Sequence, residues 1–301
     1  MGVEWEHFVA GTTGGFISTL MLHPLDLLKI RFAVNEGNRA MRPQYDSYWQ
    51  AARMIVGMSG RVGSLYQGVA PNLVGAMTAW GTYFLVYNSL KDLMSQKLRA
   101  GELSARHSLI AGFGAGSFTL LITNPIWVAK TRMCLQYEHK QRQYSGLANC
   151  LWTILRKEGL RGWYKGFAVG LFGTSHGALQ FMAYDEMKKR WGTDRQSQSS
   201  ITVKGAMEHL AFAASSKMFA AASTYPYQVI RARLQEQHTV YNGFLDVVLR
   251  TWRGEGIGGF YKGLGISLVR VLPATCITFV VYEEIVAYLR ARKQRQKLVI
   301  R

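Results

Sequence analysis

The sequence contains little cysteine and few of the short motifs that mark catalytic centres. Its three cysteines, Cys134, Cys150 and Cys276, are scattered, and none belongs to a CxxC pair. Neither a disulfide framework nor a zinc site is therefore indicated. There is no HExxH motif, Walker loop or paired Cys/His cluster, and five histidines stand singly in polar or terminal settings: His7, His107, His139, His209 and His238. We expect no metal, no resident cofactor and no enzymatic activity.

Acidic side chains are also scarce, because 18 Asp and Glu stand against 36 Lys and Arg, which gives a formal net charge of +18. This excess favours an anionic partner: a nucleic acid, a membrane surface or a small anionic ligand. Charges of either sign are absent from whole windows of the chain, namely 7–25, 62–90, 107–129 and 166–184. Two further windows each contain one charge, Lys217 within 209–230 and Arg270 within 263–282.

These six windows are long enough to cross a bilayer, because a membrane helix needs about 20 mostly apolar residues. Nucleic-acid-binding domains rarely contain such windows, so we expect six membrane spans and no nucleic-acid partner. Residues 1–6 are acidic and match neither a secretory signal nor an arginine-rich transit peptide, so any organelle address is expected to be internal. A basic helical protein that binds nucleic acid and a membrane enzyme are the alternatives from other classes.

Proline is rare as well, and three of the six prolines recur at a fixed spacing. Pro24, Pro125 and Pro226 are separated by 101 residues each. A basic residue follows five positions after each proline, and an arginine follows two positions later. This period indicates internal repeats, which we place at 1–100, 101–200 and 201–301 as parts of one domain. We expect each proline to mark a kinked helix end with a basic rim.

A second block recurs between the two spans of each repeat. It contains an amphipathic stretch, such as 151–158, and closes on a tyrosine that is followed two residues later by a glycine. The closing pairs are Tyr66 and Gly68, Tyr164 and Gly166, and Tyr261 and Gly263. We expect a short helix in the membrane interface at this place in each repeat.

Three copies of the proline motif, each followed by such a block, closely resemble the mitochondrial carrier family over essentially the whole chain. The resemblance implies an all-α membrane fold with six tilted transmembrane helices around a central cavity. The helices would form three pseudosymmetric repeats with short matrix-side interfacial helices. It also implies a monomeric solute carrier of the mitochondrial inner membrane, with both termini in the intermembrane space and anionic phospholipid (cardiolipin) at the three Tyr and Gly pairs.

The departures from the family pattern point to the cargo. Members normally carry an acid two residues after each proline, but here only Asp26 does, while Trp127 and Gln228 stand at the other two positions. The Pro-Ile-Trp form is similar to the subgroup that carries nucleotides, NAD, FAD and folates, and 172–184 is similar to members that carry folate or FAD. We therefore expect transport of a large anionic cofactor, folate or FAD, with a pyrimidine nucleotide or NAD as the alternative.

The resemblance also implies two gates. At the matrix gate, Asp26 is expected to pair with Lys130, while Lys29 faces Gln228 and Arg231 faces Trp127. At the cytoplasmic gate the family pattern is incomplete, and its candidate residues are Lys91, Asp185, Lys188 and Glu283. Exposed ion pairs contribute only about 0–1 kcal/mol each, so we expect shallow gates and transport without strict counter-exchange.

Between the gates, three polar side chains are expected at one depth. Lys217 and Arg270 interrupt apolar windows, where a charge is costly and usually functional, and helix rise brings His176 to a similar level. Arg270 also matches a substrate contact position of the family, and its guanidinium suits carboxylate or phosphate. At the matching positions Gly75 and Gly173 leave room for a flat ring.

Each of these assignments has a purely structural alternative. Lys217 could extend along its helix to water, and His176 could be a packed, hydrogen-bonded helix residue. Trp127 could stack on the ring of the substrate or serve only as an interfacial anchor.

Overall fold

The computed structural model describes residues 2–35, 45–98, 105–136, 143–191, 203–237 and 241–299, and every element in these ranges is helical. One order of elements occurs in the first and third copies: a long helix, a short helix, a single turn and a second long helix. The first copy consists of α1 (Gly2–Val34), α2 (Tyr48–Ser59), η1 (Val62–Tyr66) and α3 (Val69–Leu98). The second consists of α4 (Ala105–Cys134), α5 (Leu147–Trp163), α6 (Phe167–Phe172) and α7 (Ser175–Trp191). In this copy α5 includes the turn beyond a kink at Gly159, and the second long helix is divided into α6 and α7. The third consists of α8 (Val203–Gln235), α9 (Phe244–Glu255), η2 (Ile257–Tyr261) and α10 (Leu264–Val299). The expected repeat boundaries at 100–101 and 200–201 lie outside the described residues.

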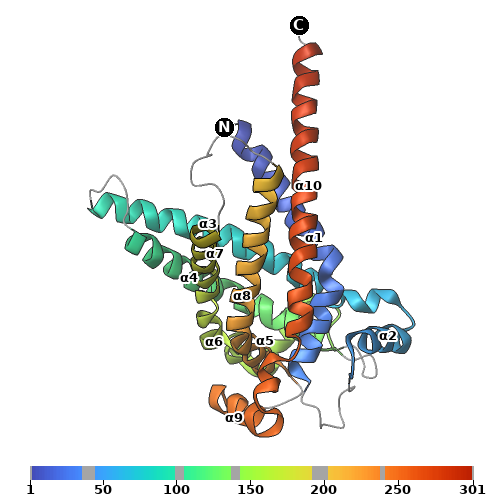
Figure 1. Cartoon of the computed structure of the whole chain (residues 1–301). Helices are drawn as coiled ribbons and strands as arrows, with labels where there is room; N and C mark the ends of the chain where they lie inside the picture. Colours follow the sequence, from blue (N-terminus) through green and yellow to red (C-terminus); the bar gives the residue numbers. More distant parts are fainter. Residues whose placement is uncertain are drawn as a thin grey trace.

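The long helices pack as three pairs, each formed between neighbouring copies (Figure 1). We call these pairs arms: α3 with α4, α7 with α8, and α10 with α1. The arms meet at one end of the molecule, which we call the base, and diverge from it, with α3 and α4 leaving at a wide angle to the other two arms (Figure 1). The base is therefore closed, while the far ends of the arms stand apart.

The three repeated prolines lie inside helices, so the prediction of helix ends at these positions is wrong. Helix α1 continues from Pro24 to Val34, and α4 and α8 likewise continue past Pro125 and Pro226. A proline removes one helical hydrogen bond and bends the helix. The residues beyond each proline are nevertheless buried and hydrogen-bonded in the base, which holds them helical.

The apolar core is concentrated at the base, where the short helices cover the ends of the long ones. Ile55 of α2 packs with Leu27 of α1 and Ile266 of α10, and Ile154 of α5 packs with Val128 of α4. Away from the base, large apolar side chains such as those of Leu85, Phe113, Val269 and Phe181 are exposed. Many exposed apolar side chains of this size suit a lipid environment.

Two segments among the described residues, Leu109–Cys134 and Ile257–Leu289, are both long and apolar enough to span a membrane by length and composition. They belong to the second and third copies, and their mean hydropathies are 1.4 and 2.0. The six-span arrangement therefore remains a prediction.

Candidate functional site

Three buried arginines close the base in a ring. Arg31, Arg132 and Arg233, which we call the ring arginines, are at most 1% exposed. Each donates a hydrogen bond from its Nε to a backbone carbonyl at the end of the first long helix of the next copy. The bonds join Arg31 to Cys134 O (3.1 Å), Arg132 to Gln235 O (3.2 Å) and Arg233 to Ala33 O (3.0 Å). Because the three acceptors are also 101 residues apart, each copy holds the next in the same way.

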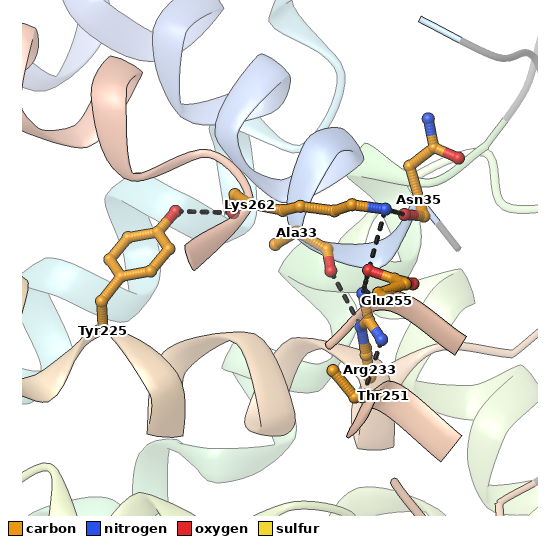
Figure 2. Close-up of polar contacts among 7 residues, drawn as sticks. All are labelled: Ala33, Asn35, Tyr225, Arg233, Thr251, Glu255 and Lys262. Atoms are coloured by element: carbon orange, nitrogen blue, oxygen red, sulfur yellow. Dashed lines mark hydrogen bonds and ion pairs between the residues drawn. The ribbon is translucent and has the colours of Figure 1, made fainter. Parts of the chain in front are cut away.

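Two ring arginines are neutralised by a carboxylate that a lysine also contacts. Figure 2 shows the third copy, where Glu255 accepts a hydrogen bond from Arg233 at 2.9 Å and forms an ion pair with Lys262 at 2.8 Å. Lys262 also reaches the carbonyl of Asn35 in the first copy (2.7 Å) (Figure 2). These contacts tie the third copy to the first.

The second copy repeats this carboxylate arrangement. Arg132 and Lys165 contact Glu158 at 2.6 and 2.8 Å. Partial burial acts to raise the pKa of Glu158, but the hydrogen bonds from Arg132 and Lys165 outweigh it and lower that pKa to about 2. The first copy has Ser59 and Gln67 at the corresponding positions, and Gln67 accepts a hydrogen bond from Arg31 at 3.1 Å.

The residue before each repeated proline forms a side-chain hydrogen bond that joins its helix to the turn of the same copy. The three residues differ in chemistry but are all fully buried. They are His23, which contacts Gln67 O at 2.9 Å, Asn124, which donates to Trp163 O at 2.7 Å, and Tyr225, which donates to Lys262 O at 3.1 Å. The last of these bonds is visible in Figure 2.

Asp26 pairs with Arg270 in this structure and not with Lys130 as predicted. Arg270 Nη1 lies 2.9 Å from Asp26 Oδ1, and Asn72 donates a hydrogen bond to Asp26 Oδ2 at 3.3 Å. The Asp26 side chain is only 6% exposed, and that of Arg270 is 31% exposed. The pair forms because α10 lies alongside α1, a long-range contact that the sequence gives no local signal for.

Lys130 lies over the ring of its own helix neighbour Trp127, 5.4 Å from the ring centroid. The indole of Trp127 donates to Thr123 Oγ1 at 3.2 Å. The ring packs against Gly75, where a Cβ atom would come within 3.3 Å of it. The room that Gly75 leaves is therefore occupied here by the protein's own aromatic ring.

The other two basic residues of the predicted matrix gate contact amides of neighbouring copies. Lys29 donates to Gln228 Oε1 at 2.9 Å, which is the predicted facing pair. Arg231 was predicted to face Trp127 but donates to Asn124 Oδ1 at 3.2 Å. These hydrogen bonds join α1 to α8 and α8 to α4, so they cross between the arms at the base.

The second copy has a break between α6 and α7: Gly173 follows the end of α6, and His176 lies in the first turn of α7. His176 Nδ1 is 2.9 Å from Thr224 Oγ1 of α8, and Gly173 packs on Tyr227, where a Cβ atom would lie 3.0 Å from the phenol oxygen. The letters 173–177 have GxSxG spacing, but a nucleophile elbow needs a strand before its helix, and here helices lie on both sides. Lys217, on α8, is exposed.

The four residues of the predicted cytoplasmic gate lie toward the diverging ends of the arms. Lys91, Asp185, Lys188 and Glu283 are all exposed, and no ion pair among the described residues joins them. Arg190 instead pairs with Glu186 one turn away on α7. The conformation thus has a closed base and no contact among these four side chains.

The predicted lipid positions are packed against the protein's own helices at the base. Tyr66 stacks on His23 and Tyr261 on Tyr225, while Tyr164 donates to Leu121 O at 3.2 Å. The glycines Gly68, Gly166 and Gly263 have φ of +79°, +73° and +87°, a left-handed conformation that glycine adopts without strain.

The sequence interpretation missed several residues that the structure brings into these networks. Asn72 was not singled out, because nothing local marks an asparagine in an apolar window as the partner of Asp26. Glu158 and Glu255 could have been found, since each precedes a glycine at the same distance from the closing tyrosine of its block. The residues before the repeated prolines share the 101-residue period, but their different chemistry hid their common role.

Comparison with known proteins is consistent with this threefold architecture. The model of the mitochondrial carrier protein family matches the chain three times, at residues 4–98, 101–195 and 203–293. The chain is 38% identical to folate transporter 1, chloroplastic, of Arabidopsis thaliana, over 95% of this chain and 96% of the relative. It is 33% identical to the mitochondrial FAD carrier protein of Saccharomyces cerevisiae, over 93% and 96%. It is also 33% identical to nicotinamide adenine dinucleotide transporter 2, mitochondrial, of Arabidopsis thaliana, over 93% and 78%. The three matches together cover most of the sequence, so the chain belongs to the mitochondrial carrier protein family.

Proposed function

We propose that this protein carries a large anionic cofactor, folate or FAD, across the mitochondrial inner membrane by alternating access. The relatives named for folate and for FAD align over nearly the whole chain, which supports transport as the activity in place of catalysis. The proposed cofactor is cargo and is not retained. The proposed carrier acts as a monomer with six membrane spans, its base toward the matrix and cardiolipin at the three Tyr and Gly pairs.

The observation that carries this proposal is the charge of the nominated site and matrix gate. Five cations stand there against the single carboxylate of Asp26, which leaves an excess of 5 − 1 = 4 positive charges: Lys29, Lys130, Lys217, Arg231 and Arg270. Lys130, Arg270 and Lys29 all act electrostatically on Asp26, and Arg270 acts on Lys217. Cations concentrated at membrane depth are costly unless an anion offsets them, so a cargo with several negative charges suits this site.

The conformation supports a mechanism in which the base opens in response to cargo. In this structure the arms meet at the base and their far ends diverge (Figure 1). In the proposed cycle, this conformation accepts cargo from the intermembrane space. The hydrogen bonds from Lys29 and Arg231 cross between arms to neutral amides. Such bonds contribute about 1.5–3 kcal/mol when one partner is charged. Cargo that binds the open-base state more tightly by a similar amount shifts the population toward it.

A pyrimidine nucleotide or NAD is the second candidate cargo, because the relative named for nicotinamide adenine dinucleotide aligns over 93% of this chain. These ligands share a phosphate-bearing anionic part and a flat ring with FAD. A guanidinium recognises phosphate and carboxylate in the same bidentate way, so charge alone does not separate folate from the nucleotides.

The test is uptake by the purified protein in liposomes, with FAD, tetrahydrofolate, NAD and UTP compared at equal concentration. We expect FAD or tetrahydrofolate to be taken up at least tenfold faster than UTP. Lys217→Ala should reduce that uptake, while Lys157→Ala, which removes an exposed lysine on α5, should not. Faster uptake of NAD or UTP would assign the cargo to the second candidate, and no uptake of any of the four would refute the proposal.

The same liposomes test whether transport requires counter-exchange of cargo. Uptake into vesicles without internal cargo is expected, because the predicted gates are shallow. Absence of uptake there, with normal uptake into preloaded vesicles, would show strict exchange.

A further inference from the structure

The carboxylate of Asp26 is held on both oxygens, although the site around it carries an excess of cations. Oδ1 contacts Arg270 at 2.9 Å, and Oδ2 accepts the amide N–H of Asn72 at 3.3 Å. Asn72 is itself buried, and its amide also lies 3.4 Å from Nδ1 of His23. These contacts fix the orientation of the carboxylate and aim one oxygen at Arg270.

The contact between Asp26 and Arg270 has two counterparts in the other arms, and neither of them involves charge. Arg270 lies seven residues after Gly263, just as Gly75 and Gly173 lie seven after Gly68 and Gly166. Gly75 receives the ring of Trp127, and Gly173 receives the ring of Tyr227. In two arms a glycine therefore seats an aromatic ring, and in the third an arginine meets a carboxylate.

The other cations near Asp26 have different partners. Lys29 donates to Gln228, and Lys130 lies over Trp127. Arg270 is thus the cation to which Asp26 is bonded. The Arg270 side chain is 31% exposed while that of Asp26 is 6% exposed, so an anion can approach Arg270 from its exposed side while Asp26 stays covered.

We propose that Asp26 is a built-in competitor that occupies Arg270 in place of the anionic group of the cargo and so sets how strongly the cargo must bind. This inference rests on the proposed function, in which Arg270 binds the anion. A ligand whose site is available only part of the time binds more weakly by that fraction. If Asp26 held Arg270 for about nine-tenths of the time, the apparent affinity would be about tenfold lower than that of the free guanidinium.

The competitor also discriminates between ligands. An anion that contacts Arg270 through two oxygens can replace the carboxylate, because bidentate contacts to a guanidinium are the stronger ones. A neutral ligand with the same ring has no anionic group to bind Arg270, so it leaves the ion pair between Asp26 and Arg270 intact. Once the Asp26 carboxylate is released from Arg270, it interacts electrostatically with Lys130 and Lys29. Binding of the cargo to Arg270 therefore changes how the charges at the base are paired.

The experiment is equilibrium binding of FAD to the purified full-length protein, with riboflavin as the uncharged ligand that keeps the flavin ring and lacks the pyrophosphate and adenosine. The variants are Asp26→Asn, Arg270→Ala and the double variant. Asp26→Asn keeps an oxygen for Asn72 but removes the charge, and we expect it to bind FAD about tenfold more tightly with riboflavin unchanged. In the double variant the gain should vanish, because coupling between neighbouring residues shows as non-additivity.

The outcomes separate the two proposals. If wild type binds FAD, Arg270→Ala binds it weakly and folded Asp26→Asn binds it no more tightly, the competitor role is overturned while the site stands. If Arg270→Ala binds FAD as wild type does, the site itself is wrong. Equal tightening for riboflavin would also contradict the competitor role, since riboflavin has no anion to place on Arg270. If Asp26→Asn does not fold, Asp26→Ser is measured in its place, because a serine hydroxyl also accepts from Asn72 but is uncharged.

Discussion

The threefold repeat is preserved at the level of the ring arginines and is broken at the level of the residues two positions after the repeated prolines. At the base, the three ring arginines make the same bond to the same position of the next copy. One or two turns earlier in the same helices, the residues two after the prolines are Asp26, Trp127 and Gln228, and their partners differ in chemistry. The level that holds the copies together is repeated, whereas the level that we propose to meet the cargo is not.

This difference has a simple physical origin. Three copies can close a ring only if each presents a donor where the next presents an acceptor, so the ring arginines and the carbonyls that they contact recur. A cargo has no threefold symmetry, so three different side chains around it can contact it in more ways than three equal ones. We therefore expect substitutions of the ring arginines and their partners to lower stability. Substitutions at the level of Asp26, Trp127 and Gln228 should change the binding of cargo.

The largest effect on stability is expected from Arg233→Ala. The change leaves Glu255, which is 11% exposed, with Lys262 as its remaining ion-pair partner. Loss of one partner of a buried pair costs about 3–5 kcal/mol, and we expect about 3 kcal/mol because Lys262 stays in contact. Thermal unfolding in detergent measures the change. Arg190→Ala, which breaks the exposed pair with Glu186, is the control and should cost about 0–1 kcal/mol. Equal effects of the two variants would show that the ring does not hold the base.

A smaller effect is expected from acid, through Glu158. Its pKa in the folded protein, about 2, lies below the ordinary value of 4.5, so its contribution to stability is present above pH 4.5 and is lost as the pH falls toward 2. Because Glu158 is 28% exposed, we expect about 1–2 kcal/mol. Unfolding of wild type and Glu158→Gln is compared at pH 6 and pH 3. The wild type should be the more stable at pH 6, and the gap should narrow at pH 3; a gap that stays constant would contradict this role of the carboxylate.

The smallest effect on stability is expected at Gly75. Replacing glycine by alanine inside a helix normally stabilises it by about 0.5–1 kcal/mol, and Gly81→Ala, where nothing lies within 4 Å of the new Cβ atom, should show that gain. At Gly75 the new atom would meet Ile126 and Trp127 at 3.2–3.3 Å, so the gain should disappear. Thermal unfolding of the two variants checks this, and an equal gain at both positions would mean that Trp127 is not seated on Gly75.

Much of the fold could be predicted from the sequence, because it depends on features that recur. The 101-residue period and the charge-free windows correctly indicated three copies of long helices with a short helix between them. The helix ends were misplaced at the prolines, because the buried hydrogen bonds that carry α1, α4 and α8 past them come from other copies. A local rule about proline contains no information about those partners.

The site could be predicted only residue by residue. Arg270 and Asp26 were each recognisable as unusual charges, but their contact links residues 244 positions apart and depends on how α10 lies along α1. The same is true of Trp127. The sequence suggested that its ring could stack on a ligand, whereas in the structure the ring packs against Gly75. Side chains that share a motif were found, whereas of the predicted pairings between motifs only that of Lys29 with Gln228 is present in the structure.

The most direct test of the division between the two levels is FAD and tetrahydrofolate uptake by Arg270→Ala in liposomes, measured beside its thermal unfolding. Arg156→Ala, which removes an exposed arginine of α5, is the control. We expect Arg270→Ala to lose at least tenfold in uptake of the transported cofactor. The double variant with Asp26→Asn does not leave the buried carboxylate without its arginine, so it should lose uptake equally while its unfolding temperature stays close to that of wild type. Normal uptake by folded Arg270→Ala would contradict the account.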